Sequence, residues 1–340
     1  MITLAVHYAQ PPQWRWYILG YFVLAGLAGG AYAIGTMMRL WGRSEHEPAA
    51  RLSFLLSLPL LVLCPVLLTV DLGSPLRFWH MLIDTGAGGG PFVFKPWSPM
   101  SLGAWALLVF GVFAALSFLE ALALEGRSYP LSGLVVRLLS GPVGRAVNVV
   151  GAVLAIFIAG YTGVLLSVSN QPVWSDTYAL GGLFLASGLS GAAALVALLL
   201  SRRGRAAPET DAELAGTERL FALLLRRRAA GAAAETEAEL TEAERLFALL
   251  ELALIAVLLV TLGFAGQLTR AVGPPWTVLW VVAVLGLLPA LAGRAGSRLT
   301  VGGGGVAALT RVGLPAAVVA GAVLVGVVAL RAAVLWSAQG

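Results

Sequence analysis

The stretch WRWYILGYFVLAGLAGGAYAIGTMMRLW, residues 14–41, indicates the class of fold. Between Arg15 and Arg39 it contains no charged residue. A helix needs about 20 consecutive apolar residues to cross the hydrocarbon core of a bilayer. The stretch is therefore predicted to be a transmembrane helix. The residues before it lack a basic region and the apolar run is too long for a signal peptide, so this helix is expected to stay as a membrane anchor.

Similar apolar segments recur along the rest of the chain, most of them long enough to cross a bilayer. Composition agrees, with 59% hydrophobic residues, 11% charged residues and a mean hydropathy of +0.88. These values describe a chain whose solvent is mostly lipid. We predict an all-α integral membrane protein with eight transmembrane helices, the other seven at residues 52–72, 99–125, 146–168, 177–200, 246–268, 276–293 and 312–336.

The basic residues predict the orientation of the helices. Of the 22 Lys and Arg residues, 17 fall in alternate connections: those at 39–51, 127–145, 202–245 and 294–311. Because basic residues are retained on the cytoplasmic side, both termini are expected on the periplasmic, outer side. The excess of basic residues gives the chain a pI near 9.8. We attribute this excess to the topology and to contact with anionic membrane lipid, and not to nucleic-acid binding. The outer side keeps only Arg15, Arg77, Lys95, Arg270 and Arg331.

Missing residue types exclude several kinds of electron-transfer cofactor. The single cysteine, Cys64, cannot hold an iron–sulfur cluster. The three histidines, His7, His46 and His80, fall in predicted terminal or loop segments, which disfavours a haem ligated between helices. No metal site is predicted. If the protein handles electrons, a mobile cofactor must carry them.

Two connections depart from the pattern of helices joined by short loops. The outer loop 73–99 is rich in Gly, Pro and aromatic residues, and a loop of this length is usually functional or disordered. The cytoplasmic insert 201–245 contains ETDAELAGTERLFALL (209–224), which recurs as ETEAELTEAERLFALL (235–250). Each copy is predicted to be a helix, and the second is expected to run into the sixth transmembrane helix. The duplication is either a docking site for a cytoplasmic partner or a neutral insertion.

The chain is accordingly divided into an outer N-terminal segment 1–13, helices one to five in 14–200, the insert 201–245, and helices six to eight in 246–340. Charged residues inside membrane helices are costly and are read as functional by default. Glu120 and Glu251 are candidates for a proton path, although both lie close enough to the inner surface to reach water.

A second set of polar residues falls at similar depth on the outer side. It comprises Asp71, Tyr161, His80, Tyr17 and Tyr21. A quinone carbonyl requires hydrogen-bond donors, and a quinol requires an acceptor for each departing proton. Tyr, His and Asp supply both in an apolar cleft. For Tyr17 and Tyr21 the alternative is an aromatic belt at the membrane surface.

Four motifs resemble one known family. They are DLGSPLRFWHML (71–82), SPMSLGAWALL (98–108), AGYTGVLLSVSNQPVW (159–174) and LRAAVLWSAQ (330–339). Together they resemble the NrfD/PsrC family, the membrane subunits of polysulfide reductase and related complexes. The resemblance covers the chain apart from the insert.

The resemblance implies two four-helix bundles, with a menaquinone or ubiquinone site in helices one to four near the outer face. It also implies quinone-site roles for Asp71 and Tyr161. The implied partners are an iron–sulfur subunit of the four-cluster ferredoxin type and, through it, a catalytic molybdopterin or multihaem subunit, in the bacterial cytoplasmic membrane.

From residues and resemblance together we predict a membrane anchor subunit that exchanges electrons and protons between the quinone pool and an iron–sulfur partner. Tyr161 and His80 would bind the quinone and Asp71 would accept a proton. Arg77 and Lys95 would serve partner docking, or act as interfacial anchors. Proton translocation is open, and the chain alone should catalyse nothing. The alternatives are a proton or small-solute transporter without a redox role, or a purely structural anchor.

Overall fold

The computed structural model describes residues 12–83, 92–127, 129–205, 216–292 and 316–339. The described residues are helical and contain no strand. Parts of the predicted segments 1–13, 73–99 and 201–245 lie outside this range. The helices are α1 (Trp16–Trp41), η1 (Ser44–His46), α2 (Glu47–Asp71), η2 (Pro75–Met81), α3 (Pro99–Leu124), α4 (Ser132–Leu139), α5 (Pro142–Ser167), α6 (Ala179–Arg205), α7 (Gly216–Phe264), α8 (Leu268–Val272), α9 (Thr277–Ala292) and α10 (Ala316–Ser337).

Seven of the described helices are long and apolar enough to cross a membrane, so the chain is a multi-pass membrane protein. They are α1, α2, α3, α5, α6, the second half of α7, and α10. The eighth predicted segment, 276–293, corresponds to α9, a mostly apolar helix of 16 residues that ends at Ala292, the last described residue before residue 316. The count of eight spans therefore stays a prediction.

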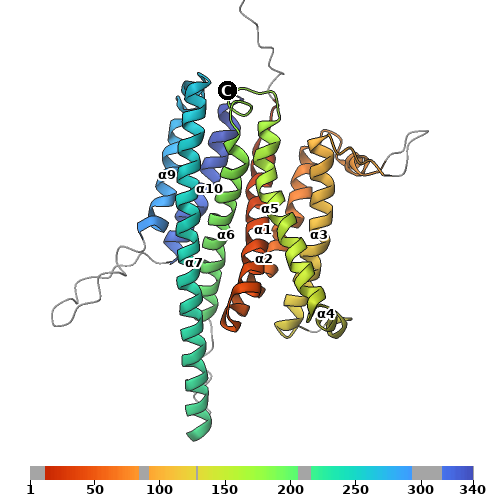
Figure 1. Ribbon diagram of the computed structural model, residues 1–340, viewed down its shortest axis with the longest axis vertical. Helices are drawn as coiled ribbons and strands as arrows, with labels where there is room; N and C mark the ends of the chain where they lie inside the picture. The colour runs from red at the N-terminus through yellow and green to blue at the C-terminus, as the bar shows by residue number, and fades with distance from the viewer. Residues whose placement is uncertain (1–11, 84–91, 128, 206–215, 293–315, 340) are drawn as a thin grey trace, which may run out of the picture.

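The long helices pack as two rings of four (Figure 1). In the first ring α1 packs on α2, α2 on α3, α3 on α5 and α5 on α1. In the second ring α6, α7, α9 and α10 close in the same way. Helix α1 also packs on α6 and α10, and 83% of its apolar window is buried within the protein. Helix α5 packs on α6 as well, so α1 and α5 both join the first ring to the second.

Small residues let the central helices approach closely. A Cβ at Gly30 in α1 would lie 2.6 Å from the carbonyl oxygen of Gly188 in α6, and a Cβ at Gly188 would lie 2.8 Å from the carbonyl oxygen of Gly26. In lipid, helix association depends on such packing and on interhelical hydrogen bonds, because lipid tails are as apolar as the side chains. The α1–α6 contact therefore joins the two rings through backbone.

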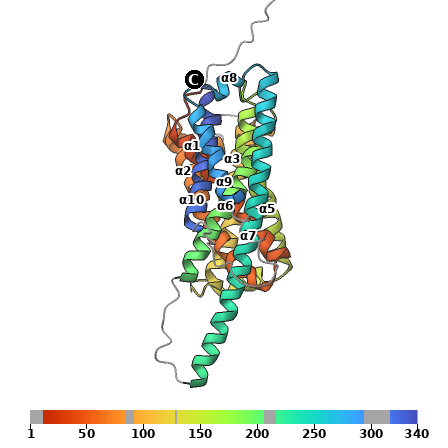
Figure 2. The same cartoon turned by 90° about the vertical axis from the view of Figure 1, so that its left-hand side faces the viewer.

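The two ends of the bundle differ, and "upper" and "lower" below refer to the view in Figure 1. The upper end holds the start of α1, η2, α8 and the end of α10, and the lower end holds η1 and α4 (Figures 1 and 2). Helix α7 runs without interruption from Gly216 to Phe264, so the second copy of the duplication continues into the membrane span as expected. Its first part extends beyond the other helices at the lower end (Figure 2).

A contact at the lower end holds this long helix against the body. His46 in η1 is 1% exposed, and its Nδ1 lies 2.8 Å from the Thr236 hydroxyl of α7. Its Nε2 lies 3.2 Å from the Glu239 carboxylate, and Arg43 pairs with Glu235 at 3.5 Å. His46 is thus buried at the end of the short helix η1, where residues of the second copy of the duplication contact it.

Candidate functional site

In the upper half of the bundle a groove of about 480 Å³ lies between α3 and α5 of the first ring and α6 of the second. Its walls are almost wholly apolar and aromatic, and they include Pro99, Leu102, Phe157, Tyr161 and Leu185. Gly160 in α5 and the pair Gly181 and Gly182 in α6 carry no side chain, so the backbone itself forms part of the groove wall. An apolar groove with few polar groups is the usual form of a small-molecule site.

Tyr161 supplies a phenol hydroxyl at this groove. Its ring stacks on Phe157 with a centroid distance of 5.4 Å and an interplanar angle of 26°. Its hydroxyl donates to the carbonyl oxygen of Pro99, the first residue of α3. A Cβ at Gly103, one turn further along α3, would collide with that hydroxyl. The tyrosine is therefore positioned by α3 as well as by its own helix.

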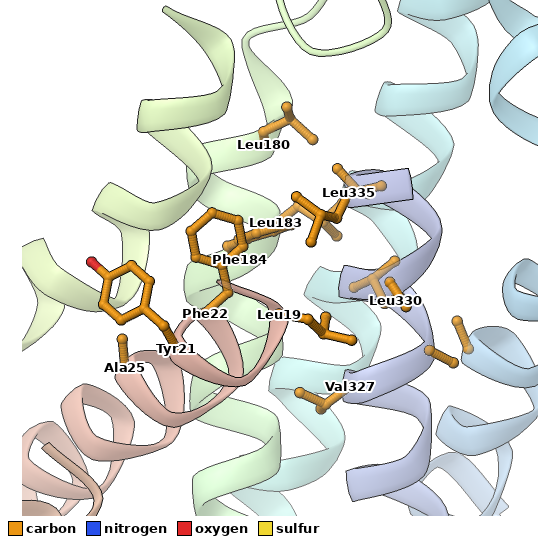
Figure 3. Close-up of a cluster of buried hydrophobic side chains, with 14 of the residues drawn as sticks. Leu19, Tyr21, Phe22, Ala25, Leu180, Leu183, Phe184, Val327, Leu330 and Leu335 are labelled. Atoms are coloured by element: carbon orange, nitrogen blue, oxygen red, sulfur yellow. The ribbon is translucent and has the colours of Figure 1, made fainter. Parts of the chain in front are cut away.

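Tyr21 lies on the inner side of the same region. It is 5% exposed, and the centroid of its ring lies 5.5 Å from that of Phe22. Figure 3 shows its hydroxyl directed away from α10, while the neighbouring Phe22 points toward Phe184. Tyr161 lines the groove and Tyr21 does not. Tyr17, one turn earlier in α1, is 46% exposed on the surface of the bundle.

The other predicted quinone-site residues lie at the same end but not in the groove. Asp71 is the last residue of α2 and is half-buried, and within the described range its carboxylate makes no hydrogen bond or ion pair. His80 is exposed on η2, with its ring edge-on to Trp79 at 3.9 Å. Neither residue lines the groove. The roles assigned to them stay predictions.

The predicted docking residues lie on an exposed surface at the upper end. Arg77 and Lys95 are both exposed. Apolar neighbours are exposed as well: Leu76 is 89% exposed, Trp97 79% and Phe92 68%. A soluble partner or the membrane surface can cover such side chains.

The two predicted proton-path carboxylates have different surroundings. Glu120 is buried at the lower end of α3, where Arg39 donates to it at 2.6 Å. Arg39 also donates to Glu47 at 2.9 Å, so α1, α2 and α3 are joined by one ion-pair network. Glu251 is 1% exposed in α7, and its Oε2 makes no hydrogen bond to the described residues.

The sequence interpretation misses the most buried charge of the described chain. The charge pattern groups Arg331 with the few basic residues of the outer side, but the structure buries it fully in α10. It donates to the carbonyl oxygen of Phe22 in α1 and, at 2.9 Å, to that of Phe184 in α6. The signal in the sequence is its position in LRAAVLWSAQ, where no second charged residue accompanies it. Among the described residues no group of three His, Cys, Asp or Glu side chains is arranged to hold a metal ion.

Comparison with known proteins gives one consistent result. A family model described as "Polysulphide reductase, NrfD" matches residues 6–339. Protein NrfD of Escherichia coli (strain K12) is 27% identical over 218 residues, covering 61% of this chain and 65% of the relative. The C chain of polysulfide reductase from Wolinella succinogenes is 32% identical over 184 residues, covering 52% and 55%. The C subunit of selenate reductase from Mesobacillus selenatarsenatis is 28% identical over 71 residues, covering 21% and 17%. The matched region spans less than two thirds of each relative's length.

Proposed function

Because the chain belongs to the NrfD family, we propose that it is the membrane subunit of a respiratory oxidoreductase and that it exchanges electrons and protons with a membrane quinone at the Tyr161 groove. The family match supports a subunit of this general kind, and the names of the similar proteins are those of reductase subunits. The quinone, the partner and the orientation are parts of the proposal.

The observation that carries the proposal is the placement of the Tyr161 hydroxyl on a groove whose lining is mostly apolar, with a second phenol from the exposed Tyr178. A quinone head group is flat and apolar except for two carbonyl oxygens, and each oxygen needs a donor. The groove offers a flat aromatic wall in Phe157 and a phenol hydroxyl in Tyr161. Its volume and apolar lining fit a head group that enters from the lipid with its isoprenoid tail behind it.

Different residues would bind the quinone and transfer its protons. Tyr161 would turn its hydroxyl from the Pro99 carbonyl to a quinone oxygen, and Tyr21 would approach the quinone from α1. Asp71 and His80, at the same end of the bundle, would accept protons and release them to the water outside. A quinol bound there would supply two electrons and two protons.

Electrons would leave through a partner seated on the upper end. The exposed apolar side chains of the outer loop, together with the basic residues Arg77 and Lys95, would form a docking surface. An iron–sulfur subunit that carries acidic residues would bind there. That subunit would connect to a catalytic molybdopterin or multihaem subunit. The upper end would face the periplasm, since most arginines lie in connections at the lower end, and α9 would complete eight spans in the cytoplasmic membrane.

The test is to purify the protein in mild detergent from its native host, identify the copurifying subunits by mass spectrometry, and extract the lipid fraction for quinone. An iron–sulfur subunit together with bound quinone is the expected result. Asp71→Asn should then leave the complex assembled but slow quinol oxidation. A chain that purifies alone and free of quinone from gently solubilised membranes would contradict the proposal.

A further inference from the structure

The groove has a second phenol at its rim. Tyr178 immediately precedes α6 and lines the groove together with Tyr161 of α5. Among the described residues of the lining, the side chains that can donate a hydrogen bond are these two tyrosines and Trp97. A quinone has two carbonyl oxygens, so a site with Tyr161 at one of them requires a donor at the other.

The three donors lie on different walls of the groove. Helix α5 lies between α3 and α6 and packs on both (Figure 1). The Tyr161 hydroxyl is held at the α3 wall, where it donates to the carbonyl oxygen of Pro99. Trp97 precedes Pro99 by two residues and belongs to the same wall. Tyr178 is therefore the one side-chain donor of the described lining at the α6 wall, where Gly181 leaves the backbone uncovered.

The backbone before Tyr178 is anchored to the second ring. Thr177 is 2% exposed, and its Oγ1 lies 2.9 Å from Oγ1 of Thr261 in α7. Trp174 is fully buried, and its indole N–H donates to the carbonyl oxygen of Val334 in α10 at 2.7 Å. The connection between α5 and α6 is thus fixed at two points, and it places Tyr178 beside the groove.

The side chain of Tyr178 is 99% exposed, although the residue before it is buried. An aromatic belt at the membrane surface would account for the exposure alone. It would not account for an anchored backbone that places the ring at the rim of a groove. Because the backbone is already fixed, Tyr178 can turn its hydroxyl toward a ligand without the cost of ordering a loop.

We propose that Tyr178 is the second hydrogen-bond donor of the quinone site, and that its hydroxyl bonds the carbonyl oxygen that Tyr161 does not reach. The inference deepens the proposed function and rests on it. The two oxygens of a quinone project from opposite edges of a flat ring, so donors on the α3 and α6 walls suit them. The head group would lie across α5 between the two phenols. Thr261 would be a positioning residue, since it acts through Thr177.

The experiment is to titrate the purified full complex with menadione by calorimetry. Tyr178→Phe removes only the hydroxyl of an exposed side chain, so the variant should fold as the wild type does. Loss of one hydrogen bond between neutral groups should raise Kd about fivefold to tenfold. Tyr161→Phe should also raise Kd. If the two phenols bond different oxygens, the two rises should multiply in the double variant.

Two further variants test the anchored connection. Ser175→Ala is the matched control, because its hydroxyl donates to the Gln171 carbonyl at 2.7 Å and does not line the groove. Its Kd should equal that of the wild type. Thr261→Val should raise Kd in the wild-type background and leave it unchanged in the Tyr178→Phe background. A merely structural role of Thr261 would raise Kd in both.

The outcomes separate this inference from the proposed function. An unchanged Kd in Tyr178→Phe beside a raised Kd in Tyr161→Phe would overturn the inference and leave the quinone site standing. A raised Kd in Trp97→Phe in place of Tyr178→Phe would assign the second bond to that indole. A double variant no weaker than Tyr161→Phe would contradict the assignment to separate oxygens. Failure of the wild-type complex to bind menadione would refute the quinone site itself.

Discussion

The ring of Tyr161 in α5 lies against the bare Cα of Gly103 in α3, and its hydroxyl reaches back to the carbonyl oxygen of Pro99 one turn earlier. The surfaces of α3 and α5 are therefore complementary at the groove. In helices that pack in lipid, a glycine commonly permits close approach of backbones. Here it makes room for the one hydroxyl that can meet a ligand on the α5 wall of the groove.

Gly103→Ala should displace that tyrosine. A methyl group at this position would overlap the phenol and cost about 2 kcal/mol of overpacking. Misplacement of the hydroxyl should lower quinol turnover by roughly tenfold or more, measured in membranes with a quinol analogue. Gly111→Ala is the control on the same helix, because nothing lies within 4 Å of a Cβ there. Equal activity of the two variants would remove Tyr161 from the site.

Tyr161→Phe should separate a quinone-binding role from a structural one. The change removes only the hydroxyl, so stability should fall by about 1 kcal/mol for the lost bond to Pro99, whereas turnover should fall by about a hundredfold. Tyr129→Phe makes the same chemical change at the lower end, where that hydroxyl donates to the Leu119 carbonyl at 3.0 Å. Its turnover should equal that of the wild type. Steady-state kinetics on the assembled complex measures both, and a fully active Tyr161→Phe would favour a purely structural anchor.

Glu120→Gln should destabilise the first ring. The carboxylate is nearly buried and Arg39 donates to it at 2.6 Å, so removing its charge leaves part of a buried cation uncompensated, at a cost of about 3 kcal/mol. Glu125→Gln breaks an exposed pair with Arg203 at 3.3 Å and should cost less than about 1 kcal/mol. Unfolding in mixed detergent micelles compares the two. A stable Glu120→Gln variant with altered proton uptake would instead support the proton-path prediction.

The orientation can be tested by labelling single cysteines. Cys64 is buried and can be replaced by alanine to give a background without cysteine. Ser74 lies exposed at the upper end and Ser140 exposed at the lower end. A membrane-impermeant maleimide should label Ser74→Cys in intact spheroplasts and Ser140→Cys only after the membrane is opened, because the arginine-rich connections stay inside. The reverse pattern would place both termini in the cytoplasm.

Local sequence is enough to predict the class of fold and the position of most helices. Apolar runs such as 14–41 form helices at nearly the predicted residues, because a backbone in lipid must satisfy its hydrogen bonds within the segment. The motif around Tyr161 also identifies the residue that the structure places on the groove, since a phenol set among glycines deep in an apolar span is poorly accounted for by an aromatic belt. These features depend on neighbours in the chain, and the sequence shows those neighbours directly.

The surroundings of Arg331 and His46 depend on packing between distant helices. The charge pattern predicts Arg331 at the outer side, yet its acceptors are the carbonyl oxygens of Phe184 and Phe22, 147 and 309 residues away. His46 is buried in η1, where it is hydrogen-bonded to the hydroxyl of Thr236, 190 residues away. Backbone carbonyls carry no sequence signature, and a charge can be buried only where distant helices bring such acceptors together. The link between the two rings is therefore a property of the packing and not of any one segment.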